Sequence, residues 1–214
     1  MKYDTVIFDL DGTLLDTLED LKDSLNYALE QAGMPPRSME EVRRFVGNGI
    51  RRLLELSVPE GEANPRFEET LASFLSHYGQ HCNDKTAPYP HIMELLEALK
   101  KKGYRMAIVS NKYYEGVQEL KRLYFADYVS VAIGEKEGIR KKPAPDTVLE
   151  ALKELGSSKE RAVYVGDSEV DIATAANTGM DCIAVAWGFR TRQEQEAAGG
   201  KAFAEEPLDI LHMV

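Results

Sequence analysis

The chain has 214 residues, of which 43% are hydrophobic and 29% charged, with a net charge of -10 and a pI near 5.0. This composition is typical of a globular protein with a sizeable core, and at ~150 residues per domain it allows a core and a smaller insert. The acidic balance disfavours a nucleic-acid binder, and the lack of a long apolar run or a leader predicts no membrane association and a cytoplasmic location.

The first predicted element is a short apolar run, Val6 to Phe8, which is typical of a strand buried on both faces. Two carboxylates, Asp9 and Asp11, and then Gly12 end this strand. A carboxylate at the end of a buried strand loses its hydration, so its presence there indicates a function. We interpret Asp9 as a nucleophile and Asp11 as its acid/base partner, with a divalent cation reducing the repulsion between them.

The segment from residue 16 to residue 82 contains only helical patterns. Apolar residues recur at helical spacing from residue 18, and a glycine followed by two prolines ends this first helix. Ser38 and Glu41 have the spacing of a capping box at the start of the next helix. The sequence Gly47-Asn48-Gly49 interrupts that helix, a third helix follows directly, and a fourth begins near Phe67.

From residue 89 onward, predicted strands alternate with predicted helices. The strands are expected at 104–109, 128–133, 162–165 and 182–186, and the helices at 92–101, 115–123, 143–155 and 170–178. Such alternation implies right-handed crossovers and an α/β fold with a doubly wound parallel sheet. We therefore expect residues 1–15 and 83–214 to form an α/β core, and residues 16–82 to form a small helical insert.

Four groups of polar residues fall at the carboxyl ends of the predicted strands or at a helix start. They are Asp9 with Asp11, Ser110 with Asn111, Lys142, and Asp167 with Asp171. Ligands of doubly wound sheets collect at this edge. The inventory suits phosphoryl transfer, because a phosphate dianion repels a carboxylate nucleophile unless a cation and fixed donors take up charge. Carboxylates can hold Mg²⁺, which prefers oxygen ligands.

These motifs carry a resemblance to a known family. The chain has Asp-x-Asp-Gly-Thr from Asp9 to Thr13, then Ser110, then a lysine–proline pair at Lys142, and finally Gly-Asp-x-x-x-Asp from Gly166 to Asp171. In this order and spacing the motifs resemble those of the haloacid dehalogenase superfamily, specifically its phosphatases with a small helical cap. The resemblance covers essentially the whole chain, including the position of the helical insert.

The resemblance implies a role for each matching residue. Asp9 would attack phosphorus and form an aspartyl-phosphate, while Asp11 would protonate the leaving alcohol and later deprotonate the attacking water. Mg²⁺ would be held by Asp9, by Asp11 through its backbone carbonyl and by Asp167, with Asp171 in or next to that shell. The transferring phosphoryl group would be held by Ser110, Asn111 and Lys142.

Within the superfamily, the chain is most similar to phosphoglycolate phosphatases. The supporting stretches are Val46 to Gly49, Ser110 to Lys112, and Ala186 to Gly188. We therefore expect a small phosphorylated metabolite as substrate, with 2-phosphoglycolate the leading candidate. Gly47, Asn48, Gly49 and Lys112 are the candidate specificity residues.

Alternatives to this function remain open at the sequence level. A β-phosphoglucomutase-like mutase shares the fold but typically lacks Thr13, and a pyrophosphatase or a non-catalytic regulatory protein that binds phosphate is also considered. Dehalogenases proper lack the second aspartate, so dehalogenation is disfavoured. The sequence predicts no oligomeric state.

Simpler interpretations exist for several of these residues. Asp171 can complete a capping box with Ser168, Ser110 can cap the following helix, and Lys142 can be a surface lysine. A calcium loop starting at Asp9 is excluded, because Leu14 occupies the position that such a loop needs for glycine.

Other residue types allow further interpretations away from these motifs. His77 and His81 have the spacing of a zinc pair on a helix but lack a third ligand nearby. Four arginines, Arg43, Arg44, Arg51 and Arg52, fit a solvated helical face, or one of them binds a substrate carboxylate. Trp187 is expected to pack in the core. The two cysteines, Cys82 and Cys182, are expected to be reduced thiols.

Overall fold

The structure is a computed structural model that describes residues 2–214. The contacts within the chain divide it into two compact units. The core unit comprises the described residues up to Leu15 together with Pro88–Val214, and the insert unit comprises Asp16–Ala87. The sequence pattern places the second transition after residue 82, whereas the compact units change after Ala87.

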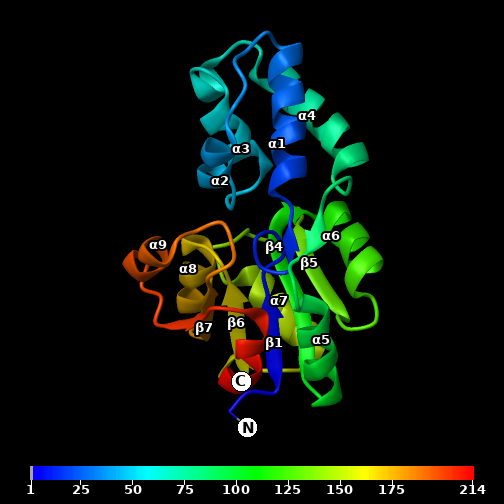
Figure 1. Ribbon diagram of the computed structural model, residues 1–214, viewed down its shortest axis with the longest axis vertical. Coiled ribbons are helices and arrows are strands. Elements are labelled where there is room, and N and C mark those ends of the chain that lie inside the picture. Colours follow the sequence, from blue (N-terminus) through cyan, green and yellow to red (C-terminus); the bar gives the residue numbers. More distant parts are fainter. Residues whose placement is uncertain (1) are drawn as a thin grey trace. The chain divides into compact units, whose positions relative to one another are not determined.

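A six-stranded sheet forms the centre of the core unit (Figure 1). Its strands are β1 (Thr5–Phe8), β4 (Arg105–Tyr113), β5 (Val131–Glu135), β6 (Ala162–Gly166), β7 (Asp181–Val185) and β8 (Ala202–Ala204). They lie in the order β5-β4-β1-β6-β7-β8, and every neighbouring pair is parallel. The predicted doubly wound parallel sheet is confirmed, with β1 at its centre.

Both faces of the sheet are apolar, which is why helices cover both. Along β1, Val6 and Phe8 belong to one buried cluster, whereas Ile7 belongs to the other. Because alternate residues of a strand point to opposite faces, a continuous apolar run must be buried twice. The first cluster includes residues of α5 (Ile92–Lys101), α6 (Tyr114–Leu120) and α10 (Ile210–Met213). The second includes residues of α7 (Asp146–Leu155) and α8 (Glu169–Thr178).

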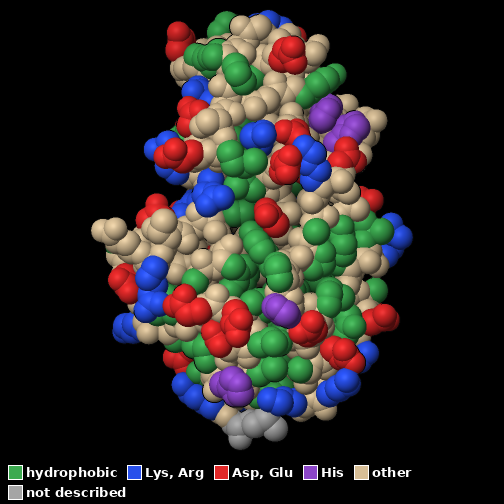
Figure 2. All heavy atoms as spheres, viewed as in Figure 1, with side chains coloured by type: hydrophobic (Ala, Val, Ile, Leu, Met, Phe, Trp, Pro, Cys, Tyr) green, Lys and Arg blue, Asp and Glu red, His purple; other side chains and the backbone are tan. Residues whose placement is uncertain are grey.

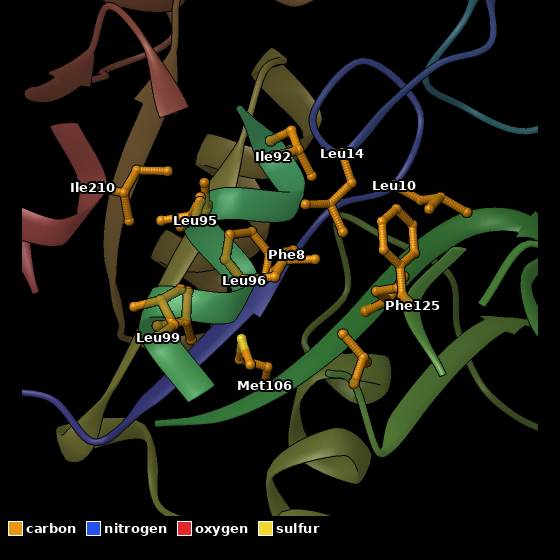
Figure 3. Packing of buried hydrophobic residues seen from close by; sticks show 14 of the residues in the cluster. Phe8, Leu10, Leu14, Ile92, Leu95, Leu96, Leu99, Met106, Phe125 and Ile210 are labelled. Atoms are coloured by element: carbon orange, nitrogen blue, oxygen red, sulfur yellow. The ribbon is translucent and has the colours of Figure 1, made fainter. Parts of the chain in front are cut away.

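The packing of α5 illustrates how the sequence pattern becomes a core. Its apolar residues recur at helical spacing and are at most 1% exposed, namely Ile92, Leu95, Leu96 and Leu99. Figure 3 shows these side chains beside Phe8 of β1, Met106 of β4 and Ile210 of α10. The packing fixes β1, and with it the turn that follows.

The insert unit is built from four helices, as the sequence pattern predicts. They are α1 (Leu18–Gln31), α2 (Met39–Phe45), α3 (Ile50–Ser57) and α4 (Phe67–His81), with a 3₁₀ turn, η1, at Gly61–Ala63. Ser38 and Glu41 form the predicted capping box at the start of α2. Gly47 and Gly49 both have positive φ between α2 and α3, a conformation that glycine adopts without strain.

The chain passes between the two units through a short two-stranded ribbon. Its strands are β2 (Leu15–Asp16) and β3 (Ala87–Pro88). Just before β3, the buried carboxylate of Asp20 in α1 accepts hydrogen bonds from the backbone N–H groups of Lys85 and Thr86 and from the Thr86 hydroxyl. These bonds attach residues 85–86 to the insert unit, which explains why this unit extends beyond the predicted residue 82.

The remaining elements of the core unit are short. They are the π-helix η2 (Lys121–Phe125), the 3₁₀ turns η3 (Lys159–Arg161) and η4 (Pro207–Asp209), and the helix α9 (Arg192–Ala197). In the described part of the chain, no helix is long and apolar enough to cross a membrane. On the face shown in Figure 2, the described basic side chains are interspersed with acidic ones and form no continuous basic area.

Candidate active site

The turn after β1 brings Asp9, Asp11 and Thr13 to the carboxyl edge of the sheet. The carbonyl oxygen of Leu10 accepts hydrogen bonds from the N–H groups of Thr13, Leu14 and Leu15, which closes the turn. Asp9 is only 7% exposed, and its N–H donates to Val165 of β6 at 2.9 Å. The first acidic motif is therefore held by the backbone of the neighbouring strand.

Lys142 reaches into this site from the loop before α7. Its side chain is 3% exposed, and its ammonium group donates to Oδ1 of Asp9 and to Oδ1 of Asp171, both at 2.7 Å. It also lies 3.0 Å from the hydroxyl of Tyr164. Burial alone lowers the pKa of Lys142, but the charges of Asp171 and Asp9 outweigh burial and raise the pKa, so the lysine is charged. The simple interpretation of Lys142 as a surface lysine is wrong.

Asp171 lies in the first turn of α8 and is completely buried. Its Oδ1 accepts from Lys142 and Tyr164, and its Oδ2 accepts from the N–H and hydroxyl of Ser168. Burial raises the pKa of Asp171, but the charge of Lys142 and these hydrogen bonds lower the pKa by more than burial raises it. The net shift is therefore downward. The capping box at Ser168 is present, and the same carboxylate also positions Lys142.

Asp167 follows β6 and is 1% exposed. Its Oδ2 accepts from the N–H of Phe189 at 2.7 Å, and its Oδ1 lies 3.4 Å from the hydroxyl of Thr13. Burial, and then the charge of Asp171, raise the pKa of Asp167 to about 7. Burial and the charge of Asp171 likewise raise the pKa of Asp9 well above its ordinary value.

The three buried carboxylates form one cluster. Among residues 2–214, Asp9, Asp167 and Asp171 are the only group of three or more potential metal ligands, with one oxygen of each within 4.8 Å of the others. When all three are ionised they outweigh the single ammonium of Lys142 among them. Hard oxygen donors with this excess of negative charge fit a divalent cation such as Mg²⁺, and they lack the nitrogen and sulfur ligands typical of zinc.

Ser110, Asn111 and Lys112 lie within the last part of β4, which continues to Tyr113 instead of ending at Val109 as expected. The pairing of β4 with β5 is irregular between Val109 and Tyr113, so this part of the strand departs from regular geometry. The side-chain amide of Asn111 donates to the carbonyl oxygen of Lys142 at 3.0 Å. This bond links the second predicted motif to the third.

Lys112 and Asp11 form an ion pair. The ammonium of Lys112 lies 3.1 Å from Oδ1 of Asp11, and the side chain of Lys112 is 3% exposed. The sequence pattern predicts Lys112 as a specificity residue only, whereas the structure brings it to the predicted acid/base group. The only signal in the sequence is that Lys112 directly follows Ser110 and Asn111 of the second motif.

The structure also bears on the interpretations of residues away from the four motifs. His77 and His81 stack with ring centroids 4.3 Å apart, and neither belongs to a group of three potential ligands among the described residues. Arg51 pairs with Glu62 and Glu68, which favours the solvated helical face for it. Cys82 and Cys182 are both free thiols.

Three residues that touch the site were not predicted to do so. Tyr164 bonds to Lys142 and Asp171, Phe189 bonds to Asp167, and Gln195 donates to the backbone carbonyl of Asp167 at 2.7 Å. Tyr164 reads as an apolar strand residue, and Phe189 contributes only its backbone, so neither gives a sequence signal. Trp187 packs against the core as predicted, and its indole N–H also donates to the carbonyl of Thr13 at 3.0 Å.

Comparison with known proteins defines the class to which this fold and site belong. The sequence model of the haloacid dehalogenase-like hydrolases matches residues 6–185. The chain therefore belongs to this family, and the resemblance inferred from the four motifs is confirmed.

Individual relatives narrow the class further. A phosphoglycolate phosphatase from Aquifex aeolicus is 36% identical over 86% of this chain and 85% of its own length. An N-acetylmuramic acid 6-phosphate phosphatase from Pseudomonas aeruginosa is 30% identical over 100% of this chain and 96% of its own.

A solved structure shows the same fold. The crystal structure of a Lactobacillus delbrueckii protein, provisionally named phosphoglycolate phosphatase, superimposes with a TM-score of 0.95 at 38% identity, covering 100% of this chain and 98% of that one. The chain described here is therefore a phosphatase of the haloacid dehalogenase-like family, similar to phosphoglycolate phosphatases. The non-catalytic alternative is therefore not retained.

Proposed function

We propose that the protein is a Mg²⁺-dependent phosphatase that hydrolyses a small phosphorylated metabolite through an aspartyl-phosphate on Asp9. The observation that carries this proposal is the buried cluster of three carboxylates around one ammonium group at the end of β1 and β6. Such a cluster is costly to bury unless a cation balances it, and its oxygen atoms suit Mg²⁺. The leading candidate substrate is 2-phosphoglycolate, because several relatives are named phosphoglycolate phosphatase.

Asp9 is the nucleophile in this mechanism. A carboxylate oxygen of Asp9 forms a bond to phosphorus as the bond from phosphorus to the substrate alkoxide breaks. Lys142 fixes the Asp9 carboxylate through the 2.7 Å bond to its Oδ1, and its charge reduces the repulsion between this carboxylate and the phosphate. Asp171 and Tyr164 hold Lys142 in that position. Ser110 and Asn111 are proposed to donate hydrogen bonds to the phosphoryl oxygens.

Asp11 moves the protons. It gives its proton to the leaving alkoxide, and in the second half-reaction it takes a proton from the water that hydrolyses the aspartyl-phosphate. Lys112, 3.1 Å from its Oδ1, holds the carboxylate in one orientation. Mg²⁺ would be held by Asp9, Asp167 and the backbone carbonyl of Asp11, with Asp171 in or next to that shell, and it would supply positive charge that offsets phosphate–carboxylate repulsion.

The insert unit is proposed to select the non-phosphate part of the substrate, through Gly47, Asn48 and Gly49. The support is the resemblance of Val46 to Gly49 to the corresponding stretch of phosphoglycolate phosphatases. Because the Pseudomonas aeruginosa relative acts on a phosphorylated sugar acid by its name, N-acetylmuramic acid 6-phosphate is a second candidate substrate.

The test is phosphate release with Mg²⁺ from a panel of substrates. The panel contains 2-phosphoglycolate, N-acetylmuramic acid 6-phosphate, β-glucose 1-phosphate and pyrophosphate. We expect the highest kcat/KM with 2-phosphoglycolate and one phosphate released per substrate consumed. A sugar phosphate isomer formed without phosphate release would instead identify a mutase.

The mechanism is tested by Asp9→Asn, which removes the nucleophile with little change in shape. We expect a loss of kcat of about 10³-fold or more, because the covalent route is lost. The matched control is Asp127→Asn, at an exposed position of the core unit, which should retain full activity. Full activity in Asp9→Asn would exclude the aspartyl-phosphate route.

A further inference from the structure

The segment that follows β7, residues Ala186–Arg190, contacts both acidic turns of the site. We call it the brace. It begins where the N–H of Ala186 donates to Ala204 of β8 at 3.0 Å, and it ends where Arg190 pairs with Glu169 of α8 at 2.8 Å. Between these ends, Trp187 bonds to the Asp9–Thr13 turn and Phe189 bonds to Asp167. The brace therefore joins two predicted ligand-bearing turns that are far apart in the sequence.

Gly188 sets the spacing between these two turns. A Cβ atom added at Gly188 would lie 2.2 Å from Cβ of Asp167 and 2.5 Å from the carbonyl oxygen of Gly12. A Cβ added at Gly12 would lie 2.7 Å from Oδ2 of Asp167, and Gly12 also has a φ of +89°. Because these neighbours are backbone or a short buried side chain, they cannot yield without moving Asp167. The two glycines thus allow close approach of their backbones to Asp167.

Two further contacts determine which way Asp167 faces. The N–H of Phe189 occupies Oδ2 of its carboxylate at 2.7 Å. The fully buried side chain of Gln195, in α9, donates both to the backbone carbonyl of Asp167 at 2.7 Å and to that of Val185 at 2.8 Å. The first contact commits one carboxylate oxygen to the protein. The second fixes the Asp167 backbone against the end of β7.

From these contacts we propose that the brace positions Asp167 and so sets the affinity and selectivity of the carboxylate cluster for a divalent cation. Because Oδ2 already accepts a hydrogen bond from Phe189, we expect Asp167 to bind a cation through Oδ1 alone. Mg²⁺ takes few protein oxygens in a strict octahedral geometry, whereas Ca²⁺ takes six to eight ligands and uses bidentate carboxylates. The brace therefore favours Mg²⁺ over Ca²⁺. Trp187, Gly188 and Gln195 are positioning residues in this proposal, which rests on the proposed function.

The experiment measures cation binding directly. Mg²⁺ and Ca²⁺ are titrated calorimetrically into substrate-free, EDTA-treated wild type, Trp187→Phe and Gly188→Ala, and the melting temperature of each is recorded. Trp187→Phe keeps an aromatic ring but removes the N–H that bonds to Thr13. The matched control is Gly79→Ala in α4, where an added methyl group meets nothing within 4 Å.

We expect Trp187→Phe to weaken Mg²⁺ binding about tenfold and Gly188→Ala about a hundredfold, the range found when groups that orient metal ligands are changed. Ca²⁺ binding should weaken less, so the preference for Mg²⁺ falls. Trp187→Phe should need a higher Mg²⁺ concentration than the wild type for half-maximal activity. At saturating Mg²⁺, its kcat should approach the wild-type value. Gly79→Ala should bind both ions like the wild type.

The outcomes separate this proposal from the proposed function. If both folded variants bind Mg²⁺ and Ca²⁺ with wild-type affinities and only their melting temperatures fall, the brace is merely structural and the inference is rejected. If Gly188→Ala does not fold, Trp187→Phe decides on its own. Failure of the wild type to bind Mg²⁺ or to release phosphate would instead reject the proposed function.

Discussion

Residues of the same type at the site differ in their hydrogen-bond partners and in their pKa values. Asp9, Asp167 and Asp171 are all buried aspartates, yet their surroundings differ. Both oxygens of Asp171 have two partners each, and the net shift of its pKa is downward. The pKa values of Asp9 and Asp167 are instead raised, first by burial and then by the charge of Asp171. The charge of Asp171 is thus balanced by Lys142, whereas the charges of Asp9 and Asp167 when ionised are not fully balanced by the side chains around them.

Lys112 is the residue whose role the structure changes most. Because its buried ammonium pairs with Asp11, we predict that Lys112→Met lowers kcat for the preferred substrate by about tenfold to a hundredfold, part of the ~10²–10⁴-fold that a positioned acid/base group supplies. The KM should change less than kcat. The measurement is steady-state kinetics of phosphate release at saturating Mg²⁺.

The matched control for this variant is Lys136→Met, which also breaks a lysine–carboxylate pair, but one with Glu150 of α7, which does not belong to the carboxylate cluster. It should leave both kinetic constants within about twofold of the wild type, because partly exposed ion pairs contribute little. A raised KM with unchanged kcat in Lys112→Met would return Lys112 to the specificity role predicted from the sequence alone.

At the level of elements, the sequence predicts those helices and strands that show a clear hydrophobic periodicity. The four insert helices and five of the six strands of the main sheet follow from apolar spacing. The buried run Val6 to Phe8 places the turn that carries Asp9 and Asp11 at the centre of that sheet. Strand β8 is not predicted, because Ala202–Ala204 is only three residues long, too short to show the pattern of a strand. The end of β4 was misplaced, because polar Ser110 and Asn111 continue a strand whose partner is irregular there.

The site shows the same division between pattern and contact. Motif spacing predicts that Asp9, Lys142, Asp167 and Asp171 come together, and the structure brings them into one cluster. The contacts of Phe189 and Gln195 depend on the path of the chain after β7, and no short-range pattern encodes that path. Phe189 bonds to the side chain of Asp167, and Gln195 bonds to backbone carbonyls of Asp167 and Val185. A single sequence does not reveal these pairings.

Helix α1 gives a prediction about stability. Asp20 is 3% exposed, and its carboxylate accepts hydrogen bonds from Lys85 and Thr86 at 2.8–3.1 Å. In Asp20→Asn, the NH₂ group replaces Oδ1 and faces the N–H of Lys85, and the three bonds to Oδ2 lose the extra strength of a charged acceptor. We expect the free energy of unfolding to fall by about 2–3 kcal/mol.

The measurement is urea unfolding followed by the helical circular dichroism signal. The control is Asp23→Asn, one turn further along α1, where the carboxylate is 41% exposed and pairs with Lys85. That variant should lose no more than about 1 kcal/mol, as is typical of exposed ion pairs. Equal losses in the two variants would show that the bonds from Asp20 to residues 85–86 add nothing beyond surface charge.

For the whole molecule, the charge imbalance of the site couples stability to pH. The ordinary pKa of an aspartate is 3.8, and that of Asp167 is raised to about 7 in the folded protein, chiefly by burial. Between these values the folded state binds more protons than the unfolded state. The contribution of Asp167 to stability must therefore fall as the pH rises through this window, and Asp9, whose pKa is also raised, acts in the same direction. The lowered pKa of Asp171 has its effect below 3.8.

Asp167→Asn isolates this contribution, because asparagine does not titrate. In EDTA, the free energy of unfolding of the wild type minus that of Asp167→Asn should decrease from pH 4 to pH 7 and then become constant. Trp187 is the only tryptophan in the chain and lies in the core unit, so its fluorescence during urea unfolding reports the unit that contains the site. Saturating Mg²⁺ should raise the stability of the wild type more at pH 7 than at pH 5, because the ion competes with protons for the carboxylates. If this difference in the free energy of unfolding instead stays constant or grows with pH, Asp167 is ionised throughout this range in the protein without a bound ion. The buried carboxylates would then not lack positive charge, and the argument for a cation site would fail.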